Sequence, residues 1–334
     1  MAQQRTEPLR QGTKGTPEPM DSGADGSGGE AGDDRRPAAW RRLLHKRLAM
    51  ASLSVILLLL MAAAFAGQLA PHDPQFIDYD RIDNYPDLAH RYFFGNDSTG
   101  RDVFARILYG LRVSLTVAVV VETINVLLGT SLGVIAGYFG GAVDGLISRI
   151  ADIFFAFPGI LLAVLINALF GDAFNTPPPP LDHLLPTGSG RLALIAVSIA
   201  LVSWPYMARF VRSQVLSLRE REFVESARAV GAGEARIIWR HIMPNVNNLI
   251  LVWITLDIAT VVIYEATLSL LGLGIQQPYP SIGGMINDAS AQGTIQTNPF
   301  EVLWPSLVLG LLVLAFTFLG EGLRDVLDPR AQDS

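Results

Sequence analysis

The sequence has no cysteine among its 334 residues, which excludes disulfide bonds, thiolate metal sites and cysteine nucleophiles. Its five histidines are scattered, without the spacing that metal ligands need, so we expect no metal site. Phosphate-binding loops, dinucleotide-binding turns and zinc-protease motifs are absent as well. We therefore expect a chain that has no catalytic residues, is not an enzyme and binds no cofactor of its own.

Charge is also scarce. Charged residues make up 17% of the sequence, whereas soluble domains usually have about a quarter. The net charge of −6 is not that of a nucleic-acid-binding protein, so no nucleic-acid partner is expected. Half of the residues are hydrophobic and the mean hydropathy is +0.35. This composition favours a membrane protein.

Six apolar stretches follow one another, each near the roughly 20 residues that a helix needs to cross about 30 Å of hydrocarbon. Backbone polar groups in lipid must be satisfied within the chain, so these stretches are expected to be helices. The predicted fold is therefore an all-α membrane protein with six transmembrane helices. Pro158 and Pro205 each interrupt a span and can kink it. The spans cover residues 48–69, 113–138, 150–170, 192–210, 249–273 and 302–319.

Basic residues gather in three regions: before the first span, at or between the fourth and fifth, and after the sixth. With six spans, all three regions fall on one side of the membrane. The positive-inside rule makes that side cytoplasmic, so both termini are expected in the cytoplasm. These residues are Arg41, Arg42, Lys46, Arg47, Arg209, Arg212, Arg219, Arg221, Arg228, Arg236, Arg240, Arg324 and Arg330.

The same pattern divides the chain into five segments. Residues 1–39 have few apolar side chains and cannot bury enough surface to offset chain entropy, so we predict a disordered cytoplasmic tail. Residues 40–70 hold the first span with its basic flank. Ala64-Phe65-Ala66 resembles a signal-peptide cleavage site, but the length of the apolar run favours an uncleaved anchor. The other segments are an extracytoplasmic loop at 71–112, a core with five spans at 113–325, which contains a cytoplasmic loop at 213–247, and a cytoplasmic end at 326–334.

A polar, basic segment separates the fourth and fifth spans. Phe223, Ala227 and Val230 recur at the spacing of one helix face. Gly231 can adopt the left-handed conformation that ends a helix, and Pro244 is expected to force a boundary before the fifth span. The segment is therefore predicted to form a helix, a glycine break and a second helix. Periodicity alone leaves two interpretations open: a docking element for a partner, or an amphipathic element lying on lipid headgroups.

The residues of this segment also carry a family resemblance. Glu225, Ser226, Ala227, Gly231 and Pro244 resemble the EAA loop of ABC-importer permeases, in which Glu-Ala-Ala is followed by a spaced Gly and then Ile-x-Leu-Pro. The Glu, Gly and Pro match at their spacing. The chain departs from the pattern at Ser226 and at two positions of the motif that ends in the proline.

Other blocks resemble one branch of the same family. Residues 94–106, FGNDSTGRDVFAR, are similar to the FGTDxxGRDxxSR signature of dipeptide and oligopeptide permeases, with Asn96 and Ala105 as departures. Three further blocks, at 136–141, 268–274 and 322–330, look like the same subfamily. The resemblance covers roughly residues 91–330 and is to the second, C-type permease subunit of peptide, nickel or glutathione importers.

This resemblance implies a set of partners. In that family two homologous permeases form the pathway, two ABC ATPase subunits sit beneath them, and an extracytoplasmic binding protein delivers the solute. The chain would then lie among lipids of a bacterial or archaeal cell membrane, while its partners use the ATP. Peptides are the commonest solute of the subfamily, and nickel and glutathione stay open. The implied ATPase-coupling residues are Glu225, Ser226, Ala227, Gly231 and Pro244.

Charged residues elsewhere indicate two further sites. Asp257 and Glu265 lie in the fifth span, where a central carboxylate costs about 2.5–3.5 kcal/mol on insertion scales, so we expect contact with the pathway or with a partner subunit. The alternative is a hydrogen-bonded carboxyl between helices. Arg101, Asp102 and Arg106 fall on the outer side, where they are expected to bind the solute-delivery protein or to seal the outer mouth. A local salt bridge is the alternative there.

Two other classes of protein stay open. One is an ion-coupled secondary transporter or channel that acts without ATPases and uses Asp257 and Glu265 as ion sites; this class predicts inverted repeats or broken helices, which are not evident in the sequence. The other is a membrane-anchored scaffold, which has no need of carboxylates within its spans. The ion-coupled class gives no purpose to a docking segment.

Overall fold

The computed structural model of this protein describes residues 43–175 and 189–327. These residues form helices joined by loops and turns, and within them no strand longer than an isolated β-bridge occurs. The predicted tail at 1–39 and all but two residues of the segment at 326–334 lie outside the described residues. The α-helices are α2 (Arg47–Ala64), α3 (Ala66–Leu69), α4 (Val103–Ile124), α5 (Ser131–Phe139), α6 (Gly141–Phe155), α7 (Gly159–Asn175), α8 (Ser189–Arg219), α9 (Glu222–Ala229), α10 (Glu234–Ile237), α11 (Met243–Leu270), α12 (Ile282–Ala291) and α13 (Phe300–Leu327).

Five helical stretches of the described chain are long and apolar enough to cross a membrane, and a bent pair of helices makes a sixth. The all-α membrane fold predicted from the sequence is therefore confirmed. The stretch that contains α4 and α5 runs without a break from Val103 to Phe139, through a π-helical turn at Asn125–Thr130. It starts ten residues before the predicted span at 113, because Asp102 caps α4 there. The hydropathy pattern did not predict these first turns, since they contain the charged side chains of Arg106 and Arg112.

The third span is not one straight helix. Helices α6 and α7 are bent by 77° at a short break that contains Pro158. Proline has no N–H to donate and its ring collides with the preceding turn, so a helix ends or kinks there. Pro205 does not end its helix, because α8 continues through it from Ser189 to Arg219.

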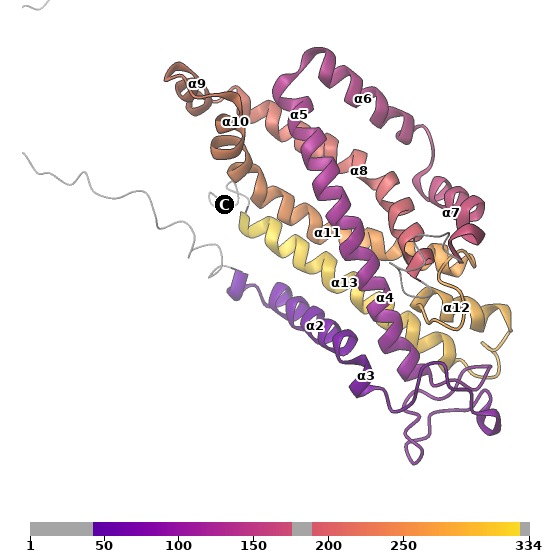
Figure 1. Ribbon diagram of the computed structural model, residues 1–334. Helices are drawn as coiled ribbons and strands as arrows, with labels where there is room; N and C mark the ends of the chain where they lie inside the picture. Colours follow the sequence, from indigo (N-terminus) through magenta and orange to yellow (C-terminus); the bar gives the residue numbers. More distant parts are fainter. Residues whose placement is uncertain (1–42, 176–188, 328–334) are drawn as a thin grey trace, which may run out of the picture.

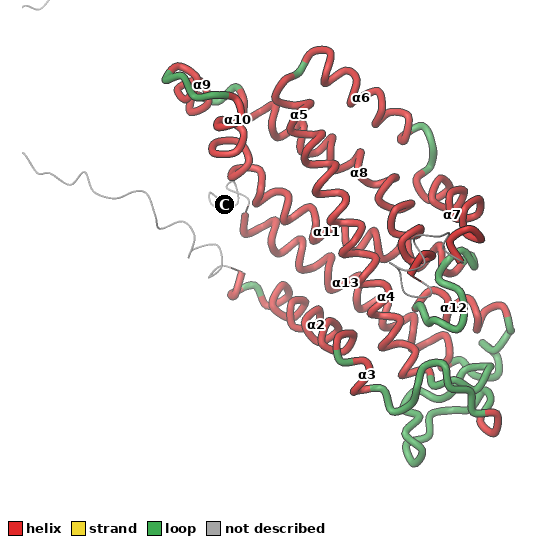
Figure 2. Tube along the Cα trace, in the orientation of Figure 1, coloured by secondary structure: helices red, strands yellow, loops and turns green. Residues whose placement is uncertain are grey.

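The bundle has two distinct ends. Figure 1 shows the start of α2, the pair α9 and α10 and the end of α13 at one end, with α12 and the loop before α4 at the other. Figure 2 shows that most of the non-helical chain gathers at this second end. This arrangement agrees with the sidedness predicted from the basic residues, since all regions assigned to the cytoplasm share one end.

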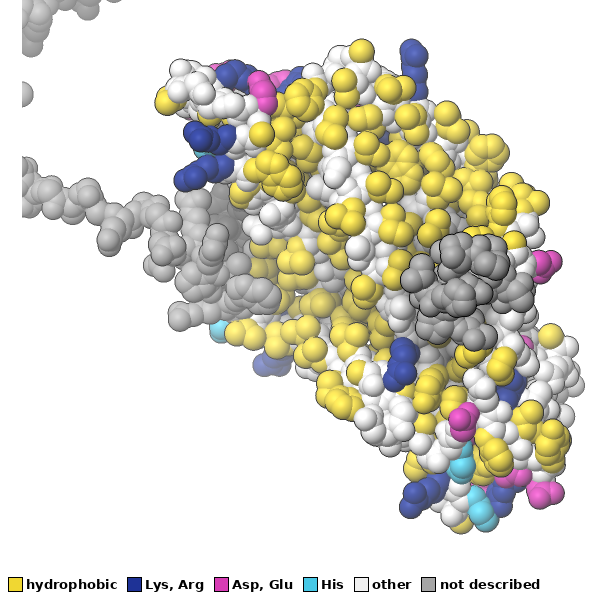
Figure 3. All heavy atoms as spheres, viewed as in Figure 1, with side chains coloured by type: hydrophobic (Ala, Val, Ile, Leu, Met, Phe, Trp, Pro, Cys, Tyr) yellow, Lys and Arg dark blue, Asp and Glu magenta, His cyan; other side chains and the backbone are white. Residues whose placement is uncertain are grey.

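The middle of the molecule carries an apolar surface. Figure 3 shows hydrophobic side chains spread over the central part of the face, while Lys and Arg gather around α9 and α10. An apolar surface of this extent is unusual on a soluble monomer and matches contact with lipid tails. Large exposed hydrophobic residues on the spans include Leu57, Leu58, Val119, Leu127, Leu161, Leu165, Leu307, Leu311 and Leu314.

Small residues allow two of the helices to pack closely. Gly129, Gly133 and Gly137 recur every four residues along the stretch that ends in α5, and they face α8. A Cβ added at Gly133 would lie 2.6 Å from the carbonyl oxygen of Ala208 and 2.8 Å from the Cβ of Val211. Such spacing brings helix backbones together, as is common between membrane helices. The chain in this region leads directly to the end of the bundle that holds α9 and α10.

Candidate functional site

A short helical projection joins α8 to α11 at one end of the bundle (Figure 1). It consists of α9 and α10 and a π-helical turn at Ile238–Ile242, and we call residues 220–242 the α9–α10 segment. Val224 is its buried anchor and belongs to a hydrophobic cluster with Ile237 and Ile242. The helix–break–helix arrangement that the sequence predicts is therefore present.

The break at Gly231 is a helix-ending turn with φ of +84°. The backbone N–H of Gly231 donates to the carbonyl of Arg228, and the N–H of Ala232 donates to the carbonyl of Ala227. These two bonds satisfy carbonyls that the end of α9 would otherwise leave free, and they require a left-handed residue between them. Gly231 provides it without a steric penalty. The conformation predicted for this glycine is confirmed.

The apolar face predicted for α9 is placed differently in the structure. Phe223 and Val230 are exposed, Val230 to 89%, and Ala227 is half-buried. The buried side chain is Val224, which lies one residue away from the predicted stripe. Helix α9 has only about two turns, so the periodicity of its sequence does not determine which side faces inward. Packing against the neighbouring helices determines it instead. Two hydrophobic side chains therefore remain on the surface of the projection.

Among the predicted coupling residues, Glu225, Ser226 and Gly231 are exposed and Pro244 is exposed as well. The boundary expected at Pro244 is absent, since the helix is continuous from Glu234 to Leu270. Pro244 lies in the first turn of α11, directly after the π-helical turn. There the side-chain amide of Asn245 donates to the carbonyl of His241 at 2.6 Å.

Polar contacts tie the α9–α10 segment to the bundle. The hydroxyl of Tyr138, at the end of α5, donates to the carboxylate of Glu234 in α10. Arg219, the last residue of α8, donates from Nη1 to the carbonyl of Gly137 at 3.2 Å. The pKa of the Arg228 guanidinium is raised by its hydrogen bond with Tyr138. The segment is therefore connected to α5 by hydrogen bonds and to α11 by a continuous helix.

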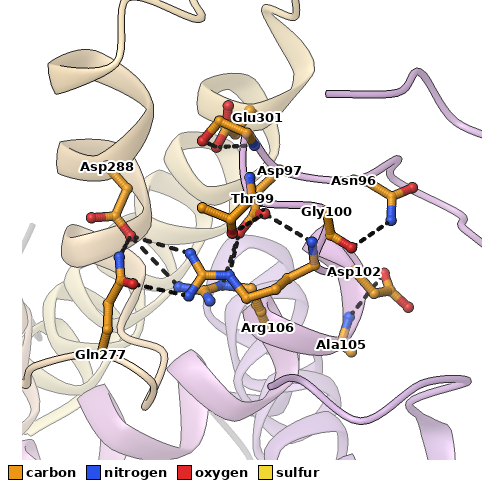
Figure 4. A network of polar contacts seen from close by, with 12 residues as sticks. Asn96, Asp97, Thr99, Gly100, Asp102, Ala105, Arg106, Gln277, Asp288 and Glu301 are labelled. Carbon is orange, nitrogen blue, oxygen red and sulfur yellow. Dashed lines mark hydrogen bonds and ion pairs between the residues drawn. The ribbon is translucent and has the colours of Figure 1, made fainter. Parts of the chain in front are cut away.

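At the other end of the bundle, Arg101 and Arg106 are buried inside the chain. Figure 4 shows Arg106 between Asp97 and Asp288. Arg101 donates from Nε to Asp97 at 2.8 Å, and Nε of Arg106 lies 3.6 Å from the same carboxylate. Both guanidinium groups also approach Asp288 of α12, at 3.8 Å and 3.7 Å. The carboxylate of Asp288 further accepts a hydrogen bond of 2.9 Å from Gln277, and its burial raises its pKa. These pairs fasten the loop before α4 to α12.

Asp102 does not pair with Arg101. Its side chain accepts from the backbone N–H of Phe104 at 2.9 Å and so caps α4, while His72 Nδ1 lies 2.9 Å from its second oxygen. Burial raises the pKa of Asp102. The local salt bridge considered from the sequence is present at Arg101, where it joins Asp97 four residues earlier in the chain. Arg101, Asp102 and Arg106 have almost no exposed surface. Their role at this end of the bundle is therefore to hold the chain together from inside.

Sequence reasoning missed the partners of these arginines. Asp97 lies inside the block at 94–106, where its charge and spacing to Arg101 were visible. Nothing in the sequence marked Asp288 or Gln277 as a partner of the arginines, because both are far away along the chain and contact Arg101 only in the folded structure. The surface of the same loop holds a second cluster, in which hydrogen bonds from His90 and Arg81 lower the pKa of Asp87 to about 2.

The two carboxylates of the fifth span occupy separate places. Glu265 is fully buried and accepts hydrogen bonds from Ser114 Oγ at 2.7 Å and from Ser269 Oγ at 2.8 Å. It therefore joins α11 to α4, which is the hydrogen-bonded alternative considered from the sequence. Asp257 is partly buried and lies 3.5 Å from Nδ2 of Asn125, at the π-helical turn.

We predict that Glu265→Leu lowers the stability of the folded bundle by about 2 kcal/mol, because two buried hydroxyls lose their acceptor. Glu265→Gln has the same shape, accepts from one hydroxyl and donates from its NH2 to the other, and is expected to stay close to the parent protein. Thermal denaturation of the purified chain in detergent measures both. Equal denaturation temperatures for the Leu and Gln variants would show that the contacts with Ser114 and Ser269 are not stabilising.

Within residues 43–175 and 189–327, no three His, Asp or Glu side chains converge in the way that a metal ion needs. The arrangement of the described chain is that of a lipid-facing bundle, with an exposed helical projection at one end and an internally fastened loop at the other.

Two family models match this chain. One is described as "Binding-protein-dependent transport system inner membrane component" and matches residues 129–333. The other is described as "N-terminal TM domain of oligopeptide transport permease C" and matches residues 38–86. The two matches leave residues 87–128 between them, and these include Arg101 and Arg106.

Curated relatives are similar over most of the chain. The glutathione transport system permease protein GsiD of Pectobacterium atrosepticum is 40% identical over 292 residues, which are 87% of this chain and 90% of the relative. The protein of the same name from Escherichia coli is 41% identical, over 87% of this chain and 89% of the relative. Among solved structures, inward-facing conformations of the MetNI methionine ABC transporter match with a TM-score of 0.49 and 20% identity, over 67% of this chain and 97% of the matched chain.

Proposed function

Because this chain belongs to the family of binding-protein-dependent transport system inner membrane components, we propose that it forms half of the translocation pathway of an ATP-driven importer of peptides. A second homologous permease supplies the other half, two ABC ATPase subunits bind from the cytoplasm, and an extracytoplasmic solute-binding protein delivers the solute. The complex lies in a bacterial or archaeal cell membrane, with both termini of this chain in the cytoplasm.

The observation that carries this proposal is the exposed α9–α10 segment. It presents a carboxylate at Glu225 and hydrophobic side chains at Phe223 and Val230 on a short helix that ends in a fixed turn. Hydrophobic side chains exposed beside charged ones are typical of an interface with another protein. An element lying on lipid headgroups remains the competing interpretation.

The connections of this segment provide a route for motion. The segment continues as an unbroken helix from Glu234 to Leu270, and Glu234 at the start of this helix is bonded to α5 through Tyr138. When ATP brings the two ATPases together, the docked segments approach each other and the attached helices tilt as rigid bodies between two arrangements. ATP binding thereby favours the outward-facing state and hydrolysis restores the inward-facing one.

The solute class follows from the relatives. Both curated relatives are named for the transport of glutathione, which is itself a peptide. The match to a model described for an oligopeptide permease points the same way. We therefore propose di- and oligopeptides, glutathione included, as the solutes.

Affinity purification of the tagged chain from its native membrane tests the proposal. A sister permease and two ATPase subunits are expected to copurify, and the reconstituted complex should hydrolyse ATP faster when its solute-binding protein is added. Ion-driven transport by this chain alone in proteoliposomes, with no ATPase bound, would favour the ion-coupled transporter instead.

Loss of the Tyr138 hydroxyl is expected to weaken coupling. Tyr138→Phe removes the bond to Glu234, and a hydrogen bond to a charged group contributes roughly 1.5–3 kcal/mol. Binding-protein-stimulated ATP hydrolysis should therefore fall about tenfold, with the subunits still assembled. The matched control is Tyr206→Phe, where the ring contact with Phe155 is kept. Equal ATP hydrolysis in both variants would contradict this role of Tyr138.

A further inference from the structure

A groove of about 410 Å³ lies between the start of α2 and the end of α13, at the end of the bundle that holds α9 and α10 (Figure 1). Ala49 and Gly322 form its floor. A Cβ added at Gly322 would lie 2.5 Å from the Cβ of Ala49, so the two helices approach each other closely there. Larger side chains form the walls, and these are Lys46, Arg47, Leu48, Phe318, Glu321 and Asp325.

This groove lies where two membrane spans end. The spans are residues 47–64 and 300–327, so the groove is at the start of one and near the end of the other. Leu48 on α2 and Phe318 on α13 are exposed, and charged residues take their place on both helices toward the chain ends. A change from exposed apolar to charged side chains marks the boundary between lipid tails and head groups. The groove is therefore at the level of the head groups.

One pair of charges in the groove is already satisfied. Nζ of Lys46 donates to the carboxylate of Asp325 at 2.6 Å, and this bond joins α2 to α13. Arg47 and Glu321 are both exposed, and neither has a hydrogen bond or ion pair with another residue of 43–175 or 189–327. A ligand in the groove thus meets one free guanidinium and one free carboxylate, both on accessible surface.

These two free charges decide which lipid head group fits. A phosphate accepts hydrogen bonds from a guanidinium, often two in parallel, and a primary ammonium donates to a carboxylate. The four charged side chains of the groove sum to zero, so a head group that carries only a phosphate brings an excess negative charge next to Glu321 and Asp325. Choline balances the phosphate but has no N–H to donate. Ethanolamine supplies both the positive charge and the donors.

We propose that this groove binds phosphatidylethanolamine from the membrane leaflet that surrounds this end of the bundle. Arg47 holds the phosphate and Glu321 holds the ammonium, while the acyl chains lie along Leu48 and Phe318. The bound lipid bridges α2 and α13 beside the bond between Lys46 and Asp325. This site serves a structural lipid, so it depends neither on the solute of the importer nor on the ATPase subunits.

Native mass spectrometry of the full-length chain tests the proposal. The protein is reconstituted in nanodiscs that contain equal amounts of phosphatidylethanolamine, phosphatidylcholine and phosphatidylglycerol with identical acyl chains, and the lipids that stay bound after release are counted. Phosphatidylethanolamine is expected to be retained about tenfold more than either of the others, because it alone makes both charge-assisted bonds. Equal retention of the three lipids overturns the proposal. So does the absence of any retained lipid, which is the result expected if another segment of the protein fills the groove.

Three single substitutions locate the binding. Glu321→Gln removes the partner of the ammonium and should lower the retention of phosphatidylethanolamine about tenfold, to the level of phosphatidylcholine. Arg47→Gln removes the partner of the phosphate and should lower it by a similar factor. Arg324→Gln is the control, because Arg324 is an exposed charge on the same helix that does not line the groove, and it should leave retention unchanged. A preference for phosphatidylethanolamine that survives Glu321→Gln, or an equal loss in Arg324→Gln, overturns the proposal. The comparison of the three lipids on the parent protein needs no variant.

Discussion

Gly231→Asp is expected to leave the complex in the membrane while binding-protein-stimulated ATP hydrolysis falls about tenfold. Gly231 has a φ of +84°, and a side chain in the left-handed region costs on the order of 1–2 kcal/mol, which corresponds to about a tenfold change in an equilibrium. The substitution destabilises the turn that ends α9, so the α9–α10 segment no longer keeps the conformation in which it docks. Membrane level is measured by quantitative blotting, and coupling by ATP hydrolysis in proteoliposomes.

Gly233→Asp is the matched control for this experiment. It adds the same charge two residues away, at an exposed position where a Cβ also meets open space. Its φ is −68°, which any residue adopts. The control should therefore retain most of its stimulated ATP hydrolysis. If both variants lose it equally, charge and not backbone geometry is responsible, and the role assigned to the turn is wrong.

Gly133→Leu is expected to destabilise the bundle by about 3 kcal/mol or more, because overpacking forces helices apart. The new Cβ alone would lie 2.6 Å from the carbonyl oxygen of Ala208, and backbone cannot move aside as a flexible side chain can. Helices α5 and α8 would then separate near the α9–α10 segment. Thermal denaturation in detergent and the level of protein in the membrane measure the effect.

Gly310→Leu provides the comparison for this variant. Gly310 lies in the middle of α13, is exposed, and has nothing within 4 Å of an added Cβ. Leucine also favours a helix over glycine by roughly 1 kcal/mol, so the control should be as stable as the parent protein or slightly more so. Equal loss of stability in the two variants would show that Gly133 is not required for the close packing of α5 on α8.

Local features of this protein were predictable from its sequence. Apolar length predicted the number of spans, since lipid admits only helices that satisfy their own backbone. Gly231 and the residues around it predicted a helix, a break and a helix, because these depend on neighbours in the chain. The motif blocks identified the family, which the comparisons confirm.

Other features depended on contacts between distant segments. The start of α4 at Val103 was missed because its first turns carry charge, and the charge of Arg106 lies beside Asp288 of α12 and Asp97. The boundary expected at Pro244 is absent because a π-helical turn precedes it. A hydropathy pattern records only the residue itself and not the partner that makes its burial possible.

The sequence alone thus determined the class of the protein, the number of its spans and the position of the helical projection between α8 and α11, because composition, period and glycine geometry act locally. Tertiary structure decided which polar side chains are internal. Glu265 is held by Ser114 across two helices, and Arg106 lies beside Asp288 of α12. Such contacts join residues far apart in the chain, and only the packing of the helices brings their atoms within reach.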